Sequence, residues 1–188
     1  MRRLIAATFL GTCVLTPAAS IAQAPSSDLP TFLVLVRHAE FAEGGPPGDP
    51  PLSPAGIKRA QDLAAVLKDT KFTAVITSQL TRTRETAQPI VSALGLTPEI
   101  VPLNRGQAVE YEKGVLAAVR KYTGRSVLVV SHSLSGPAIL TALGGPQLPA
   151  VCESVHDDLF VLIPTSEKLQ LIQSRYGAVS PTRGPDCK

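Results

Sequence analysis

Short apolar runs alternate with longer segments of helical spacing along most of this chain. The runs are rich in valine, leucine and isoleucine, as is typical of strands covered on both faces, and they occupy residues 31–36, 74–77 and 126–131. The longer segments have the pattern of amphipathic helices, and they occupy residues 53–68, 80–94 and 110–122. The pattern predicts an α/β fold, a three-layer sandwich with a mostly parallel central sheet and helices on both faces.

Weaker signals predict the remaining elements of a single domain. Residues 99–103 are typical of a short strand, residues 138–143 of a brief helix, and residues 159–163 and 169–176 of two paired strands. The Gly- and Pro-rich segment 41–51 is expected to form a surface loop near the mouth of a ligand pocket.

The predicted helices have recognisable boundaries and one clear core face. Ser53 is a good N-cap for the helix at 53–68, and Pro54 suits its first position. Pro89 is expected to interrupt the helix at 80–94. The face of the first helix that is expected to enter the core consists of Ile57, Ala60, Leu63, Ala64 and Leu67.

The first residues have the pattern of a secretory signal peptide. Met1-Arg2-Arg3 is basic, residues 4–15 are apolar but short for a membrane span, and small residues follow. The prediction is a signal peptide at 1–22, with cleavage at 24 as the alternative, followed by a single domain at 25–188. Export is expected, to the periplasm in a bacterium, and an uncleaved anchor is the alternative reading.

The charge balance gives no reason to expect a polyanionic partner. The chain has 18 basic and 15 acidic side chains, and loss of Arg2 and Arg3 with the leader brings the net charge from +3 to about +1. A nearly neutral domain without a basic run predicts no binding to nucleic acid and no stable association with a membrane after cleavage.

Two cysteines, Cys152 and Cys187, would remain after Cys13 leaves with the leader. Because an oxidising compartment permits disulfides, we predict a bridge between them that holds the C-terminal tail to the loop after Pro149. Two unpaired thiols are the alternative, because the sequence does not supply the Cα separation that a bridge requires.

Three predicted strands end in a cation or an imidazole. Arg37-His38 follows the first, a segment containing Arg82 follows the second, and His132 follows the last. Open α/β sheets bind ligands outside the carboxyl ends of their strands, so these side chains are expected to meet in one crevice. Arginine offers phosphate a fork of donors, and neutral imidazole can carry a phosphoryl group.

The order of these motifs resembles the histidine phosphatase, or phosphoglycerate mutase-like, superfamily. The motifs are Arg-His at 37–38, Leu-Ser-x-x-Gly at 52–56, Ser-x-Leu-x-Arg-x-x-x-Thr-Ala at 78–87 and Ser-His at 131–132. The resemblance covers roughly residues 32–176.

The resemblance implies roles for the motif residues. His38 would be the nucleophile, Arg37 and Arg82 would hold the phosphate oxygens, His132 would be the second imidazole, and Ser133 would add a donor. Arg84 has no match in the motif and is expected to face solvent or to pair with an acid.

The proton donor is less well defined by the motifs. The resemblance implies a carboxylate after the third strand, where Glu110 and Glu112 lie, and Glu110 is preferred. Either could instead be a helix N-terminal acid that the helix dipole favours. Glu40 is a further candidate because it is close to His38 in the chain. Less favoured positions are Asp157 and Asp158, expected to be turn acids, and His156, expected at the surface.

These features predict an exported, metal-independent phosphomonoesterase that uses a phosphohistidine intermediate on His38 and no cofactor. The short chain favours hydrolysis of a small phosphorylated substrate over a mutase reaction. The alternatives are a phosphate- or sugar-phosphate-binding protein on an inactive phosphatase fold, a phosphohistidine protein phosphatase, and a metal-dependent hydrolase using His38 and His132. No tight ligand spacing such as His-x-x-x-His supports a metal site.

Overall fold

Six strands form one mixed sheet in the order β3-β2-β4-β1-β5-β6. The computed structural model describes residues 29–165 and 169–181. The parallel strands are β1 (Phe32–Arg37), β2 (Ala74–Thr77), β3 (Glu99–Ile100) and β4 (Ser126–Ser131). An antiparallel pair, β5 (Asp158–Pro164) and β6 (Leu169–Arg175), extends the sheet next to β1. The predicted mostly parallel sheet with a terminal pair of strands is confirmed.

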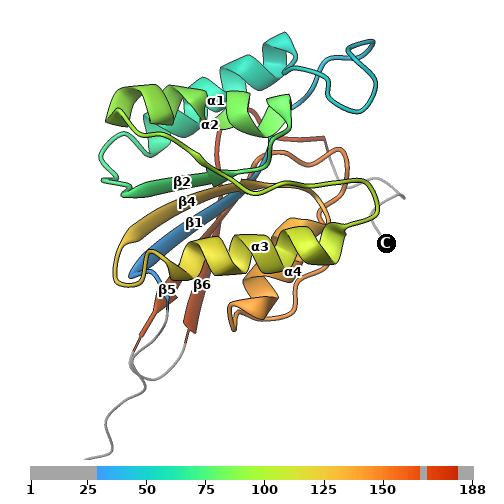
Figure 1. Ribbon diagram of the computed structural model, residues 1–188. Helices are drawn as coiled ribbons and strands as arrows, with labels where there is room; N and C mark the ends of the chain where they lie inside the picture. The colour runs from blue at the N-terminus through green and yellow to red at the C-terminus, as the bar shows by residue number, and fades with distance from the viewer. Residues whose placement is uncertain (1–28, 166–168, 182–188) are drawn as a thin grey trace, which may run out of the picture.

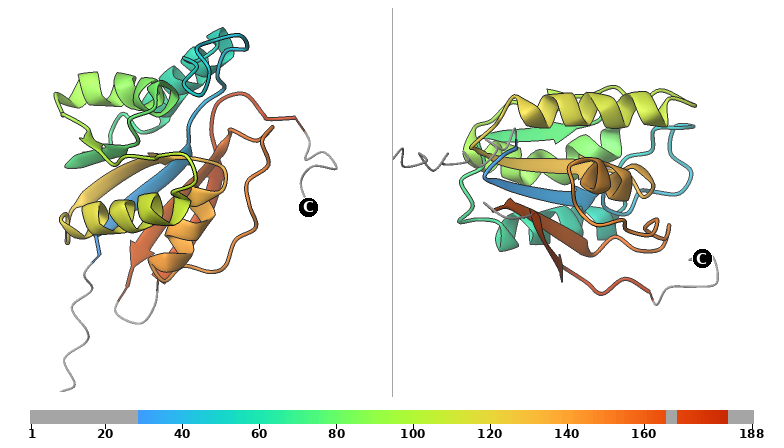
Figure 2. Two further views of the ribbon diagram at one scale, coloured as in Figure 1. Left: turned by 45° about the vertical axis from the view of Figure 1, so that its right-hand side comes forward. Right: turned by 90° about the horizontal axis from the view of Figure 1, so that it is seen from below.

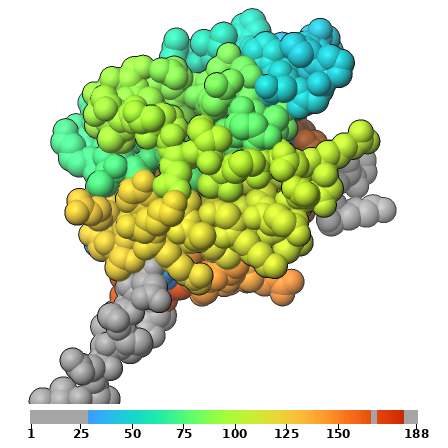
Figure 3. Space-filling model, viewed as in Figure 1, coloured from blue at the N-terminus to red at the C-terminus, as the bar shows by residue number. Residues whose placement is uncertain are grey.

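Two helices cover each face of the sheet, as Figure 1 and the turned views of Figure 2 show. α1 (Pro54–Val66) and α2 (Thr81–Leu94) lie on one face, and α3 (Ala108–Arg120) and α4 (Ser135–Ala142) lie on the other. In the space-filling view, α2, α3 and the segment between them hide most of the sheet (Figure 3). The predicted three-layer α/β architecture is therefore confirmed. Within residues 29–165 and 169–181, no helix has the length and apolar character that a bilayer crossing requires.

Alternate residues of the parallel strands enter two separate cores. Leu33 and Leu35 belong to the core beneath α3 and α4, whereas Val34 and Val36 belong to the core beneath α1 and α2. Helices cover both faces of the sheet, so both sets of alternating strand side chains are buried and apolar. The strands therefore appear in the sequence as continuous apolar runs. Each fully buried valine or leucine contributes about 1.5–3 kcal/mol, so the strands that carry the site residues are firmly held.

The N-terminus of α1 is fixed against the turn that follows β1. The Ser53 Oγ accepts a hydrogen bond from Gly56 N at 3.1 Å, and Pro54 occupies the first turn, which confirms the predicted cap. The Ser53 N donates to Glu40 O at 2.9 Å. A Cβ on residue 56 would lie 2.0 Å from that carbonyl oxygen, so only glycine permits this approach. The Leu-Ser-x-x-Gly motif therefore positions the residues that follow β1.

Two predictions about helix residues are wrong. Ile57 was expected in the core but is 51% exposed, because the buried arc of α1 is centred on Ala60 and Leu63 and does not reach it. Pro89 does not interrupt α2, which continues to Leu94. Proline removes one backbone hydrogen bond, and burial of the following Ile90 in the core offsets that loss.

Two further predictions fall outside the described residues. They are the signal peptide at 1–22, with its cleavage site, and the Cys187 half of the proposed bridge. Cys152 itself lies buried in the loop before β5. Both the leader and the disulfide therefore stay predictions.

Candidate active site

The carboxyl ends of β1, β2 and β4 meet at one edge of the sheet. In the parallel register Arg37 pairs with Ser131, so the residues that follow, His38 and His132, leave the sheet side by side. Their ring centroids are 5.4 Å apart. The register of β2 against β4 brings Ser78 and the start of α2 to the same edge. The structure therefore gathers the predicted motifs in one place.

His38 presents an uncharged imidazole. Its side chain is 3% exposed, and its Nδ1 lies 2.8 Å from Ala39 O. A carbonyl oxygen can only accept, so Nδ1 carries the proton and Nε2 keeps a lone pair. Burial is the main cause that lowers the pKa of His38 to about 2, and the positive charges of Arg37 and Arg82 lower it further. The hydrogen bond to Ala39 O acts in the opposite direction, because it favours the protonated ring. At neutral pH a nucleophilic nitrogen is therefore available.

Arg82 faces that nitrogen from the first turn of α2. Its Nε donates to Nε2 of His38 at 3.2 Å, and its Nη1 donates to Gly48 O at 3.3 Å. Thr86 lies one turn later, where its Oγ1 accepts from Ala39 N at 2.9 Å and donates to Arg82 O at 2.7 Å. The four-residue spacing between Arg82 and Thr86 therefore sets the guanidinium against the imidazole.

His132 is the second buried imidazole. Its Nε2 lies 3.2 Å from Ser78 Oγ, and its ring centroid lies 5.6 Å from that of Tyr111. Burial, followed by the charges of Arg82 and Arg37, lowers the pKa of His132 to about 3. The ring is therefore neutral at neutral pH, whereas the predicted role as a charged donor needs a proton. A phosphate dianion beside it would act to raise that pKa.

Arg37 is directed toward the segment that precedes β5. Its Nη1 donates to three carbonyl oxygens, those of Cys152, Glu153 and Val155, at 2.7, 2.9 and 3.0 Å. Its Nε is buried and has no hydrogen-bond partner among the described residues. The guanidinium thus organises the loop before β5, and its contact with phosphate stays a prediction.

Glu153 is a residue of this site that sequence reasoning missed. Its carboxylate accepts hydrogen bonds from Arg37 Nη2 and from Ser133 Oγ, each at 2.6 Å. Partial burial acts to raise the pKa of Glu153, but the Ser133 hydrogen bond and the Arg37 charge outweigh it and hold that pKa below its usual range. β5 runs antiparallel to β1, so the start of β5 returns to the edge where β1 ends. A sequence analysis that had assigned β5 as antiparallel to β1 would have placed Glu153 at this edge of the sheet.

The two residues before β5 and its first residue are buried, which corrects the prediction of turn acids and a surface histidine. The Nδ1 of His156 lies 2.9 Å from His38 O, and the two ring centroids are 5.8 Å apart. Asp157 and Asp158 are both buried, and Asp157 Oδ2 accepts from Ser180 N at 3.2 Å. Antiparallel pairing with β1 places this segment beneath the His38 backbone, which is why it is enclosed.

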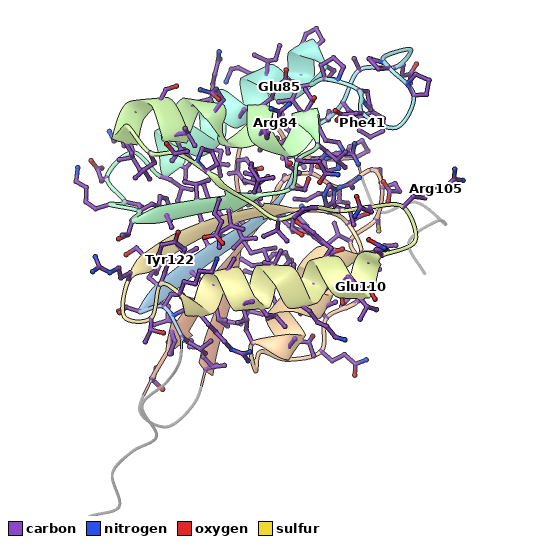
Figure 4. All side chains as sticks on the ribbon, viewed as in Figure 1. Phe41, Arg84, Glu85, Arg105, Glu110 and Tyr122 are labelled. Atoms are coloured by element: carbon purple, nitrogen blue, oxygen red, sulfur yellow. The ribbon has the colours of Figure 1, made fainter. Side chains whose placement is uncertain are left out.

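The preferred proton donor, Glu110, does not line the cavity. It is exposed in the first turn of α3, at the helix end shown in Figure 4. Glu112 is partly buried, which raises its pKa, but it does not line the cavity either. Arg84 is exposed on α2, in agreement with its lack of a motif match (Figure 4).

Glu40 is committed to an ion pair with Arg59. The Arg59 Nε donates to both carboxylate oxygens at 3.0 and 2.9 Å, and Nη2 donates to Oε1 at 2.7 Å. The Arg59 Nη1 donates to Tyr176 O at 3.0 Å. Burial acts to raise the pKa of Glu40, but hydrogen bonds, first those from Arg59, bring it below its usual value. Glu40 is therefore a structural anion and not a proton donor.

Glu40→Ala should destabilise the fold by about 3 kcal/mol, because Arg59, only 4% exposed, would lose its counter-ion. The folded pKa of Glu40 is lowered, so this stabilisation is present above the unfolded pKa and is lost as pH falls through the folded pKa. Urea unfolding at neutral and acidic pH measures both effects. Lys58→Ala breaks the exposed pair with Asp62 on the same helix and should cost less than about 0.5 kcal/mol. Equal costs for the two variants would contradict the prediction.

The site residues line a cavity of about 510 Å³. Its polar wall consists of His38, Arg82, His132, Ser133, Ser135 and Glu153. Its remaining wall is mostly apolar and consists of Phe41, Gly48, Pro50, Leu103, Ala108 and Leu134. Gly48 and Pro50 confirm that the loop 41–51 borders the pocket. The polar wall suits a phosphoryl group, and the apolar wall suits the group that carries it.

A metal-dependent reaction would need several metal-binding side chains close together in the cavity. In the part of the chain that the structure describes, no group of three His, Cys, Asp or Glu side chains is arranged to hold a metal ion. The two cavity imidazoles instead direct their Nε2 atoms to Arg82 and to Ser78. Each of these imidazoles therefore already has a polar partner within the site.

Comparison with solved structures identifies several proteins with this fold. The protein histidine phosphatase SixA in complex with tungstate has a TM-score of 0.59 and 19% identity, over 77% of this chain and 96% of that chain. A proposed phosphohistidine phosphatase SixA from Agrobacterium tumefaciens has a TM-score of 0.53 and 25% identity, over 79% and 98% of the two chains. A mycobacterial glucosyl-3-phosphoglycerate phosphatase has a TM-score of 0.56 and 17% identity, over 80% and 100%.

Family-level comparison agrees with the fold. Residues 33–105 match the histidine phosphatase superfamily (branch 1). No curated protein matches the chain. The matched region contains β1, β2 and the motifs around His38 and Arg82, and the rest of the fold supplies His132 at the end of β4. The chain is therefore similar to the histidine phosphatase superfamily, branch 1, over residues 33–105, and it shares the fold of solved phosphatases.

Proposed function

We propose that this protein is a metal-independent phosphomonoesterase that transfers a phosphoryl group first to Nε2 of His38 and then to water. The observation that carries the proposal is the state of His38. Its ring is buried and uncharged, Nδ1 is held as a donor by Ala39 O, and Nε2 is directed at Arg82. A nucleophile that is already deprotonated and oriented needs no separate base to activate it.

The proposed first step is attack of Nε2 on phosphorus. Arg82 would move its donor from the imidazole to a phosphate oxygen, where it stabilises charge that grows in the transition state. His132 would approach a second oxygen from the end of β4. Ala39 O would stabilise the phosphoimidazolium through Nδ1–H, and water would then displace Nε2 from phosphorus.

Two features support a small phosphate ester as the substrate. The cavity of about 510 Å³ accommodates a phosphoryl group with a compact carrier, and its apolar wall suits a carbon skeleton. A phosphohistidine on a protein is the second candidate, favoured by 25% identity to a proposed phosphohistidine phosphatase. Phosphate release from a phosphohistidine-bearing protein, compared with release from small esters, separates the two.

The proposal includes export. Its support is the basic and apolar leader at 1–22 and the retention of two cysteines beyond it. N-terminal sequencing of the protein recovered from a periplasmic extract tests cleavage, since retention of Met1 would contradict it.

Hydrolysis of p-nitrophenyl phosphate in excess EDTA tests the catalytic proposal. We expect release of p-nitrophenolate at a rate that EDTA does not change. Activity that EDTA removes and a divalent cation restores would overturn the mechanism. Absence of turnover, with a melting temperature that inorganic phosphate raises, would instead favour the phosphate-binding protein on an inactive fold.

A further inference from the structure

Glu153 is the only carboxylate among the described residues that line the cavity of His38. It lies in the segment between α4 and β5, and its side chain is 71% exposed. The carboxylate is therefore accessible from solvent. The other acids weighed from the sequence are outside this lining.

The position of Glu153 is fixed through both its backbone and its side chain. Arg37 donates from Nη1 to Glu153 O at 2.9 Å and from Nη2 to Oε2 at 2.6 Å. Ser133 donates to Oε1 at 2.6 Å, and its own carbonyl accepts from Val151 N at 3.2 Å. The carboxylate is thus held by residues at the ends of β1 and β4, the strands that carry the two cavity imidazoles.

The charged groups that act on Glu153 come from several packed elements. The two cations are Arg37 at the end of β1 and Arg82 on α2, and the two titratable imidazoles are His132 after β4 and His156 before β5. No other acid lines the cavity in the part of the chain that the structure describes. With these neighbours the carboxylate is ionised at neutral pH.

A bound phosphate would compete for the donors that hold this carboxylate. Ser133 lines the cavity, so its Oγ would donate to a phosphate oxygen, and the predicted contact of Arg37 with phosphate would take Nη2 as well. Glu153 would then lose two hydrogen bonds and face a dianion. Loss of hydrogen bonds to the charged form and approach of a like charge both favour the protonated carboxyl. Substrate binding would therefore raise the pKa of Glu153 and favour its protonation.

We propose that Glu153 is the proton-transfer residue of this site, donating to the leaving oxygen and accepting from the attacking water. The proposal rests on the phosphatase function given above. Its basis is geometric, because among the residues that the structure describes Glu153 alone places a carboxylate in the cavity that holds His38.

The two steps balance in atoms and charge. In the first, the bond between Nε2 of His38 and phosphorus forms, the bond from phosphorus to the ester oxygen breaks, and the Glu153 proton goes to that oxygen to give the alcohol. In the second, a water oxygen bonds to phosphorus, the P–N bond breaks, and a water proton returns to Glu153. Phosphate leaves, and both residues are restored.

Glu153→Gln tests the proposal with two substrates that differ in their need for a proton. p-Nitrophenolate leaves without protonation at neutral pH, whereas the alkoxide of β-glycerophosphate needs a proton. We expect kcat/KM to fall about 100-fold for β-glycerophosphate, in the range of general acid catalysis, and less than about fivefold for p-nitrophenyl phosphate. The ratio of the two values is the readout, because a change in phosphate affinity affects both substrates alike.

The pH dependence gives a second readout. In the wild type, the ratio of kcat/KM for β-glycerophosphate to that for p-nitrophenyl phosphate should fall as pH rises, because Glu153 must be protonated. At pH values where both phosphate esters are dianions, this ratio should be independent of pH in Glu153→Gln. Glu110→Gln is the matched control, an exposed glutamate outside the cavity lining, and it should leave the ratio at its wild-type value.

An unchanged ratio in Glu153→Gln would overturn the proposal, whether the two activities fall together or neither falls. A purely structural role for Glu153 predicts this equal loss. A wild type that hydrolyses neither substrate, or whose activity survives His38→Ala, would overturn the proposed function itself and the role of Glu153 with it.

Discussion

His38→Ala should lower kcat/KM for p-nitrophenyl phosphate by at least about four orders of magnitude, since loss of a nucleophile removes the covalent route. The physical basis is the neutral Nε2 held against Arg82, with Nδ1–H fixed by Ala39 O. Steady-state kinetics measures the loss. Acid-labile phosphate on the wild-type protein, trapped by rapid alkaline quenching during turnover, should be absent from the variant.

A neighbouring histidine provides the control for this experiment. His156 lies behind the His38 backbone and does not line the cavity. His156→Asn can still donate to the His38 carbonyl, so we expect most of the activity to remain. Comparable activity in His38→Ala and the wild type would remove His38 as the nucleophile. Thermal unfolding of both variants establishes that the fold is intact.

Arg82→Ala should cost about 3 kcal/mol of transition-state stabilisation, or roughly 150-fold in kcat/KM, by analogy with removal of one donor to a developing oxyanion. Arg82 is the cation among the described residues that line the cavity, and its Nε lies 3.2 Å from Nε2 of His38, the proposed nucleophile. The loss should appear in both kcat and kcat/KM, because the contact strengthens as charge grows on the phosphoryl oxygens.

Arg84→Ala is the matched control for Arg82. Arg84 lies two residues later on α2 and is exposed, outside the cavity lining. Its removal changes the net charge by the same amount, so it separates a general field effect from a local contact. We expect a change of less than about threefold for Arg84→Ala, consistent with a screened surface charge. A loss that small for Arg82→Ala would take Arg82 out of the site.

Most strands were predicted from the sequence within one residue at each end, but β3 ends at Ile100 and not at residue 103, and α4 begins three residues before its predicted start. β2 and β4 have the predicted ends, because buried parallel strands are continuous apolar runs bounded by polar residues. The error at Ile57 arose because helical spacing identifies a face but not the width of its buried arc. Pro89 was misjudged because local propensity does not include the core packing that retains α2.

Some residues of the candidate site were likewise predicted from the sequence, and others were placed only by the structure. His38, Arg82 and His132 were found from the sequence because each directly follows an apolar run, and parallel strands deliver their carboxyl ends to one edge. The phosphate contact of Arg37 stays a prediction, and only the structure shows its hydrogen bonds to carbonyl groups near Cys152. Glu110 was preferred as the acid by its place in the chain, yet the path of α3 leaves it exposed.

By itself, the sequence determined the layered α/β architecture and the placement of His38, Arg82 and His132 in one candidate site. These features are local, since each depends on a short apolar run and on the residues directly after it. Only the tertiary structure decided which carboxylate enters the cavity. Glu153 is separated from Arg37 by 116 residues and reaches it because β5 runs antiparallel to β1. The direction of a strand in a sheet depends on the packing of the whole chain, so no local pattern could specify that contact.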